Sequence, residues 1–299
     1  MSRNGDLEKT LAVAIDGWRV TGVELEEELK ELGHLALTAG ARLDDVVIQE
    51  RRTPDPGTLI GSGKVNELLA RADDYDMVLF NDSLKPAQHN KLRKKFKDEK
   101  KDVKVLDRSD LILDIFAQRA QTKDAKLQVE LAQLQHNLPR KRGWGVALTR
   151  LGGGIGTRGP GETKMTIKER DLRKRITQLE QKVDEIRSKR QTQRKRRRGI
   201  PEVSLVGYTN AGKSTLLNAL SNAEAKKEDM LFATLDTKTR RVHLEADRYF
   251  LMTDTVGFIS RMPDKLMEAF KATLEEVGRA DTLLHVVDIS STRMEERLD

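Results

Sequence analysis

The stretch EVSLVGYTNAGKSTLLNALS, residues 202–221, joins a strand pattern, a glycine loop and a helix pattern. Its centre, Gly207–Ser214, fits the spacing GxxxxGKS of a phosphate-binding loop, and the flanking strand and helix are the setting that such a loop requires. Glycines at both ends let the main chain turn tightly, so that its N–H groups and the helix N-terminus face an anionic phosphate. We therefore expect Lys213 to bridge the β- and γ-phosphates of a nucleotide and the hydroxyl of Ser214 to bind Mg²⁺.

Two further segments complete the pattern of a nucleotide switch. FLMTDTVGF (250–258) predicts a strand that ends at Asp254 and is followed by Gly257, a DxxG spacing. Asp254 would hold Mg²⁺ through water, and the N–H group of Gly257 would sense the γ-phosphate. Thr234 lies between the two motifs, in LFATLDTKTR (231–240), and is the natural candidate for a threonine that reaches Mg²⁺ only when the γ-phosphate is present. Such loops are ordered by a triphosphate and released on hydrolysis, which predicts a switch and not simply a hydrolase.

The predicted site has three overlapping sets of residues. The catalytic set is Lys213, Thr234 and Gly257. The metal ligands are Ser214, Thr234 and Asp254. The nucleotide contacts are Gly207, Tyr208, Thr209, Asn210, Ala211, Gly212, Lys213, Ser214, Thr215, Phe232, Ala233, Thr234, Leu235, Asp236, Asp254, Thr255, Val256 and Gly257.

Phe258 follows the DxxG pattern directly, at the place where Ras-like GTPases carry the glutamine that orients the attacking water. A phenyl ring cannot orient water. The sequence therefore predicts slow intrinsic turnover, with the water positioned by the backbone, by a bound cation or by a partner.

The N-terminal region, residues 1–108, predicts a small α/β domain. Strand patterns at 11–15, 45–50, 77–81 and 103–107 alternate with helix patterns, and this alternation implies right-handed crossovers and a mainly parallel sheet. The segment GTLIGSGKV (57–65) contains a second GSGK. Thr58 stands where a phosphate-binding loop needs glycine, and Val65 replaces the metal-binding hydroxyl, so we interpret the segment as a turn and a helix start.

Residues 109–198 predict an antiparallel helical hairpin. Leucines recur at i, i+4, i+7 and i+11 from Leu127 to Leu138, and a second apolar stripe runs from Leu172 to Ile186. Two rods with such narrow stripes bury them on each other. A glycine-rich tip loop, residues 143–163, joins them, and Pro201 helps to open the third domain, 199–299.

The tip loop and the end of the second rod predict an RNA contact. GGGIGTRGPGETK (152–164) has six glycines but lacks the preceding strand and the Lys-Ser ending of a phosphate loop, and the alternative is a flexible connector without a ligand. RSKRQTQRKRRR (187–198) carries eight basic residues and no acid, which indicates a polyanion nearby or, alternatively, a solvated helix end. The predicted RNA-binding residues are Arg158, Lys164, Arg187, Lys189, Arg190, Arg194, Lys195, Arg196, Arg197 and Arg198.

Composition limits the class of protein further. There is no cysteine, which excludes disulfides and thiolate metal sites and fits a reducing compartment. The N-terminus has no apolar targeting segment, and no window approaches the roughly 18 apolar residues of a membrane span. These features predict a cytoplasmic protein. The five histidines lie far apart in the sequence, and we expect structural roles for them.

The sequence resembles the HflX family of translational GTPases along nearly its whole length. The blocks that carry the resemblance are GSGKVNEL, LKPAQ, RSDLILDIFAQRAQTKDAKLQVELAQLQ, GIGTRGPGETK and VSLVGYTNAGKSTLLNAL. The resemblance implies GTP/GDP and Mg²⁺ as ligands, a protein that is monomeric when free, and binding to the large ribosomal subunit with the hairpin loop near the peptidyl transferase region. Members are implicated in splitting or rescuing ribosomes under stress. Asn210 matches an asparagine that helps to bind K⁺ in related GTPases lacking the glutamine.

The sequence departs from the family pattern in two places. After GPGETK the chain reads MTIKERDLRKR in place of an acidic stretch, which affects the junction of loop and helix. No NKxD guanine-reading motif occurs, and the chain ends at Asp299. We therefore expect the natural protein to continue, so that the G domain lacks its C-terminal part and TLLHVVD (282–288) is left as an unpaired apolar edge.

Two other functions compete with the GTP-driven ribosome factor. One is a nucleotide-dependent RNA-binding or helicase-like module with its own N-terminal ATP site, although residues 1–107 supply no complete phosphate loop. The other is a P-loop kinase of a small molecule, which DxxG and the basic hairpin disfavour.

Overall fold

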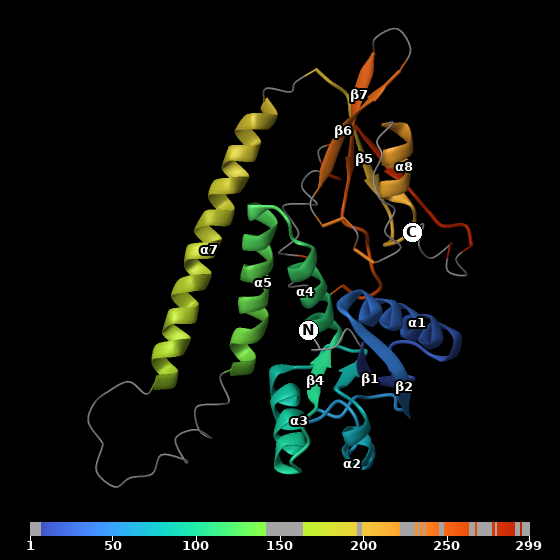
Figure 1. Cartoon of the computed structure of the whole chain (residues 1–299), viewed down its shortest axis with the longest axis vertical. Coiled ribbons are helices and arrows are strands. Elements are labelled where there is room, and N and C mark those ends of the chain that lie inside the picture. The colour runs from blue at the N-terminus through green and yellow to red at the C-terminus, as the bar shows by residue number, and fades with distance from the viewer. Residues whose placement is uncertain are drawn as a thin grey trace. The chain divides into compact units, whose positions relative to one another are not determined.

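The computed structural model (Figure 1) describes residues 7–141, 164–195, 199–221, 231–232, 234–235, 237–244, 248–262, 267, 277–278, 280–290 and 294. The chain divides into two compact units. The first unit comprises Met1–Asp114 and Gln133–Thr177, and the second comprises Ile115–Ala132 and Gln178–Asp299.

A parallel sheet forms the centre of the first unit, as the sequence predicts. Its strands are β1 (Glu8–Asp16), β2 (Ala41–Glu50), β3 (Met77–Phe80) and β4 (Lys104–Asp107). They lie in the order β2-β1-β3-β4, and each neighbouring pair is parallel. The middle strands β1 and β3 are covered on both faces, which explains why their sequences read as continuous apolar runs.

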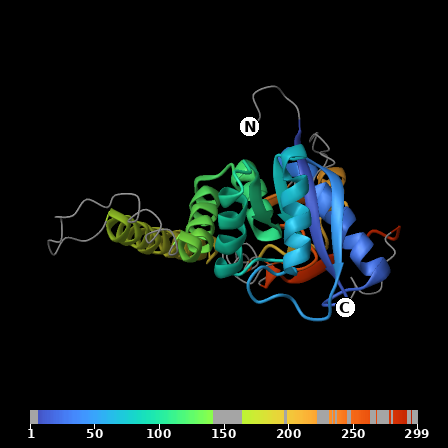
Figure 2. The same ribbon diagram turned by 90° about the horizontal axis from the view of Figure 1, so that it is seen from below.

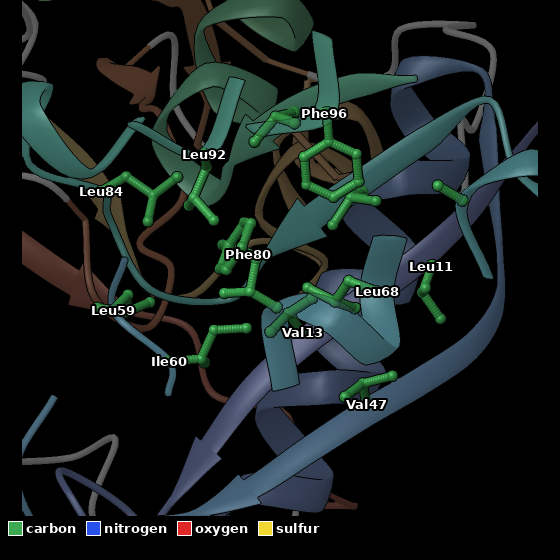
Figure 3. Packing of buried hydrophobic residues seen from close by; sticks show 14 of the residues in the cluster. Leu11, Val13, Val47, Leu59, Ile60, Leu68, Phe80, Leu84, Leu92 and Phe96 are labelled. Carbon is green, nitrogen blue, oxygen red and sulfur yellow. The ribbon is translucent and has the colours of Figure 1, made fainter. Parts of the chain in front are cut away.

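Helices connect these strands as crossovers on both faces of the sheet. They are α1 (Gly22–Ala39), α2 (Ser62–Arg71), the short 3₁₀ helix η1 (Ala72–Asp74) and α3 (Pro86–Asp98). Figure 2 shows α1 on the side of the sheet opposite α2. The core in Figure 3 lies between the sheet and the pair α2 and α3, where Phe80, Leu68 and Phe96 pack together. Gly40 ends α1 in the left-handed conformation, with φ of 90°, which suits a residue without Cβ.

The second GSGK segment is a turn and a helix start, as predicted. Gly61 is the N-cap of α2, and Val65 on the first turn of that helix is fully buried. The preceding loop is held by Asp55, whose carboxylate accepts hydrogen bonds from the N–H groups of Gly57 and Thr58. Val65 thus belongs to the hydrophobic core and not to a metal site.

Three helices lie in the described part of residues 108–195. They are α4 (Arg108–Arg119), α5 (Lys123–Lys141) and α7 (Lys164–Lys195). The predicted apolar stripes provide buried residues on both long helices, Leu131 on α5 and Leu179 and Val183 on α7. Each unit contains part of α5 and part of α7. The predicted tip loop, 143–163, lies outside the described residues.

The second unit contains a mixed sheet and the helix that follows the glycine loop. The strands are β5 (Glu202–Val206), β6 (Lys238–His243), β7 (Tyr249–Asp254) and β8 (Thr282–His285), and the helix is α8 (Lys213–Leu220). The order is β6-β7-β5-β8, with β6 and β7 antiparallel and the other pairs parallel. Among the described strands β8 is an edge, and its Leu283 is half exposed, as the sequence predicts for this segment.

A buried ionic network joins the end of β4 to α5 within the first unit. Arg140 donates to both carboxylate oxygens of Asp110, at 2.7 and 2.6 Å, and to Asp107 at 2.5 Å. His136 lies 3.0 Å from the same Asp110 carboxylate. Burial alone would raise the pKa of Asp110, but the hydrogen bonds from His136 and Arg140 hold it well below its usual range. Burial also raises the pKa of Asp107.

These groups have the spacing of a metal site but are already neutralised by the chain itself. One ligand atom from each of Asp107, Asp110 and His136 lies within 4.8 Å of the others. The guanidinium of Arg140 bridges the two carboxylates and supplies the positive charge that a metal ion would bring. The network is therefore structural, a role that we expected for the histidines but did not assign to Asp107, Asp110 or Arg140.

Removing the guanidinium should destabilise the first unit strongly. Arg140→Ala leaves two buried carboxylates without their cation, and we expect the free energy of unfolding to fall by about 3–5 kcal/mol. Arg42→Ala is the control, because Arg42 pairs with Asp44 on the surface and should contribute less than about 1 kcal/mol. Urea unfolding followed by circular dichroism measures the free energy of unfolding of both variants. A decrease for Arg140→Ala as small as that for Arg42→Ala would contradict a stabilising role of the network.

Candidate functional site

The glycine loop has the main-chain geometry that a phosphate needs. Gly207 has φ of 143°, and a Cβ there would lie 2.2 Å from the carbonyl oxygen of Val286. Gly212, the N-cap of α8, has φ of 93°. Asn210 also adopts the left-handed conformation, with φ of 62°. A loop that turns this tightly aims successive N–H groups toward one point, ahead of the positive end of α8.

Lys213 is held inside this loop. Its Nζ donates to the carbonyl oxygens of Gly207, at 3.0 Å, and Tyr208, at 2.6 Å. The side chain is only 6% exposed. Burial lowers the pKa of the Lys213 ammonium to about 8, and the carboxylate of Asp254 acts in the opposite direction. The loop therefore places a poorly solvated ammonium where an anion would stabilise its charged form.

Three oxygen-bearing side chains from three segments meet beside Lys213. The Oδ2 atom of Asp254, at the end of β7, accepts hydrogen bonds from Ser214 Oγ at 2.6 Å and Thr234 Oγ1 at 2.7 Å. The two hydroxyl oxygens lie 2.9 Å apart. Asp254 is fully buried, and within the described part of the chain its Oδ1 atom has no hydrogen-bond partner. A buried carboxylate with a free oxygen, beside two hydroxyls, is a donor set that suits a hard divalent cation.

The DxxG segment is hydrogen-bonded to the glycine loop through the main chain. The N–H group of Thr209 donates to Phe258 O at 2.7 Å, and the N–H group of Phe258 donates to Gly207 O at 3.0 Å. These bonds hold Gly257 against the loop, so that a Cβ on Gly257 would lie 2.6 Å from Thr209 Cα. The sequence predicted a role for Gly257 but did not foresee this pairing, because a main-chain contact carries no side-chain signal.

The structure brings most predicted nucleotide contacts to one end of the second sheet. Gly207–Ser214, Thr234, Asp254 and Gly257 are linked by the contacts above, and Thr255 is fixed by a hydrogen bond from its hydroxyl to Leu205 O at 2.6 Å. Ala233 and Asp236 lie outside the described residues.

The predicted RNA-binding residues are not tested by the structure. Arg158, Arg196, Arg197 and Arg198 lie outside the described residues. Lys164, Arg187, Lys189, Arg190, Arg194 and Lys195 lie on α7, and only their helical backbone is described. This interface stays a prediction.

Comparison with protein-family models assigns three consecutive parts of the chain. Residues 26–117 match the model described as "GTP-binding GTPase N-terminal", residues 119–197 "GTP-binding GTPase Middle Region", and residues 202–299 "50S ribosome-binding GTPase". The chain is 49% identical over 297 residues to "GTPase HflX" of Caldanaerobacter subterraneus subsp. tengcongensis, which covers 98% of this chain and 67% of that protein. The chain belongs to the HflX GTPase family.

Other relatives agree with this assignment. "GTPase HflX" of Escherichia coli strain K12 is 44% identical over 278 residues, covering 91% of this chain and 64% of that protein. The chain thus spans about two thirds of the length of these curated relatives. A crystal structure of a GTP-binding protein from Sulfolobus solfataricus in complex with GDP aligns with a TM-score of 0.51 and 25% identity, over 97% of this chain and 75% of that chain.

A further crystal structure, titled as the complex of SsGBP and GDP, aligns with a TM-score of 0.54 and 26% identity over 97% of this chain and 76% of that chain. The α/β architecture with a P-loop domain, predicted from the sequence, is confirmed by this likeness together with the family models. Among the described helices, none has the length and apolar character needed to cross a membrane.

Nucleotide binding should be coupled to protonation of Lys213. With a pKa of about 8, the free lysine is mostly neutral at pH 9, whereas phosphate beside Nζ favours the ammonium. We expect GDP binding to take up roughly 0.9 proton at pH 9 and much less from this group at pH 7. Calorimetry in buffers of different ionisation enthalpy measures the uptake. Lys213→Arg, which stays charged at both pH values, should remove it, and an uptake that survives in this variant would assign the proton to another group.

Gly257→Ala should separate the DxxG segment from the glycine loop. The added Cβ would meet the backbone of Thr209 at 2.6 and 2.7 Å, so the pairing through Phe258 must break. We expect the affinity for a non-hydrolysable GTP analogue to fall about tenfold or more. The affinity for GDP should fall by a smaller factor, because the Cβ also lies 2.9 Å from Lys213 Nζ but the contact with the γ-phosphate is absent. Gly33→Ala, where a Cβ meets nothing within 4 Å, is the control. Fluorescent-nucleotide titration distinguishes the outcomes, and equal losses for both nucleotides would contradict a γ-phosphate contact.

Proposed function

We propose that this chain binds Mg²⁺·GTP and hydrolyses GTP to GDP. The observation that carries the proposal is the meeting of Ser214, Thr234 and Asp254 within 2.9 Å of one another beside the buried Lys213. Ser214 and Thr234 would bind the metal through their hydroxyls, and Asp254 would hold it through water. The metal, when bound, supplies charge neutralisation at the β- and γ-phosphate oxygens.

The residues of this chain would act mainly by positioning and charge. Lys213 would turn part of its hydrogen bonding from loop carbonyls to the phosphates, and the N–H group of Gly257 would face the γ-phosphate. Phe258 offers no side-chain group to orient water, so the backbone beside it, K⁺ held with the help of Asn210, or a partner would take that part. Slow turnover in isolation follows from this arrangement.

We also propose that the protein acts on the large ribosomal subunit and remodels, splits or rescues ribosomes under stress. This rests on the family description "50S ribosome-binding GTPase" for residues 202–299 and on the basic run 187–198. The glycine-rich loop with Arg158 and Lys164 would allow close approach of the main chain to ribosomal RNA near the peptidyl transferase region. A cytoplasmic, partly ribosome-associated protein is part of the same proposal.

The helicase-like alternative has less support. Its ATP site would need a phosphate loop in the first unit, but the GSGK segment there is the start of α2, and Val65 is in the core. Retention of full ATP-dependent activity in a Lys213→Ala variant would revive it.

Sedimentation with bacterial 70S, 50S and 30S particles tests the ribosomal proposal. We expect co-sedimentation with 50S and 70S particles in a non-hydrolysable GTP analogue but not in GDP, and stimulation of GTP hydrolysis by at least about tenfold. Lys213→Ala should abolish both effects. If about six to eight of the predicted RNA-binding residues contact phosphates, affinity should fall by orders of magnitude between roughly 50 and 200 mM salt. A fast rate that particles do not stimulate, or binding insensitive to salt, would overturn the proposal.

A further inference from the structure

The segment that carries Thr234 is anchored by aromatic packing on α4. Phe232, two residues before Thr234, is 2% exposed, and its ring meets Phe116 edge to face, with centroids 4.6 Å apart and an interplanar angle of 76°. Phe116 is fully buried. Leu231 and Leu235 on either side are also buried. A loop segment with this much apolar burial is fixed by tertiary packing.

Backbone strain shows that the packing decides the conformation of Phe232. Its φ of 55° lies in the left-handed region, which a bulky side chain rarely adopts. Such a conformation persists only where the surrounding structure imposes it. The contact with Phe116 and the burial of the neighbouring leucines are the interactions that do so here.

The position of Phe232 limits where Thr234 can lie. Two residues span at most about 7 Å when fully extended. While the Phe232 ring stays against Phe116, the Thr234 Cα can therefore lie no farther than about 7 Å from that of Phe232. The observed position satisfies this limit, with the Thr234 hydroxyl bonded to Asp254 at 2.7 Å and 2.9 Å from Ser214.

We propose that Phe116 is a positioning residue for the switch threonine. It holds Phe232 and so keeps Thr234 near the metal-binding groups before any nucleotide is bound, which differs from the expectation from sequence that the triphosphate alone brings this threonine to the site. Preorganisation of this kind lowers the ordering cost of binding Mg²⁺·GTP, because Thr234 need not be drawn in from solvent. The inference deepens the proposed function and rests on it for its consequences for nucleotide affinity, but the anchoring itself is independent of nucleotide.

Phe116 lies on α4, the helix along which the chain passes from the first unit to the second. The first part of α4, Arg108–Asp114, belongs to the first unit, and its last part belongs to the second. The helix that positions the switch segment is thus the one that continues directly from β4, whose last residue, Asp107, is in the ionic network.

A thiol probe tests the anchor without nucleotide. The chain has no cysteine, so Leu235→Cys places a single reporter beside Thr234 at a position that is 4% exposed. Every rate is compared within this Leu235→Cys background, because Leu235 is itself part of the packing. We expect modification by an aromatic disulfide reagent to be about tenfold faster when Phe116→Ala or Phe232→Ala is added, and unchanged within about twofold when Leu179→Ala is added. Leu179, on α7, is equally buried in the second unit and controls for loss of packing alone. Phe116→Leu, which keeps apolar contact, should retain most of the protection.

Nucleotide affinity, measured without the thiol reporter, provides the second readout. Phe116→Ala and Phe232→Ala should each lower the affinity for a Mg²⁺-bound GTP analogue about tenfold and change the affinity for GDP less than about twofold. The double variant should bind the GTP analogue no more weakly than the single variant that has the lower affinity. Equal weakening of both nucleotides, or unchanged thiol protection in the Phe232→Ala protein, would overturn the inference. Phe232 lies outside the helices and strands, so this variant is expected to fold even if Phe116→Ala does not. Absence of nucleotide binding in the wild type would instead refute the proposed function, and the thiol result would still decide the anchor.

Discussion

The second unit depends on one buried carboxylate that is only half satisfied. Asp254 accepts hydroxyl hydrogen bonds from the helix after the glycine loop and from the segment that contains Thr234, so one oxygen atom ties three parts of the chain together. Its other oxygen has no hydrogen-bond partner within the described residues, and the nearby Lys213 is too buried to be well solvated. Burying charge without a full set of partners is costly, and in the proposed function a metal ion with phosphate would relieve both costs at once. The ligand would then complete the electrostatics of this part of the fold.

In the first unit, buried carboxylates are compensated by a side chain of the same unit. Asp107 and Asp110 are also buried carboxylates in a geometry that suits a cation, but Arg140 supplies the charge and His136 adds a hydrogen bond. One cluster is closed by a side chain and is structural. The other keeps a carboxylate oxygen without a hydrogen-bond partner within the described residues, and in the proposed function this cluster holds the metal ion. The difference lies in whether an arginine from the same unit reaches the carboxylates, and residue type alone does not show it.

This contrast explains what the sequence could and could not predict. The glycine loop, the DxxG motif and the four-stranded parallel sheet were predicted because their signals are local: a spacing, a strand ending in an aspartate, an apolar run. Strand bounds differed by a few residues, as at β8, which ends at His285 and not at residue 288. The Arg140 network and the packing of Phe232 on Phe116 were not predicted, because residues 33 and 116 positions apart meet only in the folded chain. The RNA-binding residues of the glycine-rich loop and the basic run stay predictions.

The pairing of Phe258 with the glycine loop has a bearing on how this position can change during evolution. Both hydrogen bonds use main-chain atoms, N–H and C=O, which nineteen of the twenty genetically encoded residues provide in full. The two hydrogen bonds themselves therefore exclude only proline at 258, which has no N–H group to donate to Gly207. They place no demand on the chemistry of the side chain, so a water-orienting group there would be compatible with the contact that holds the segment in place.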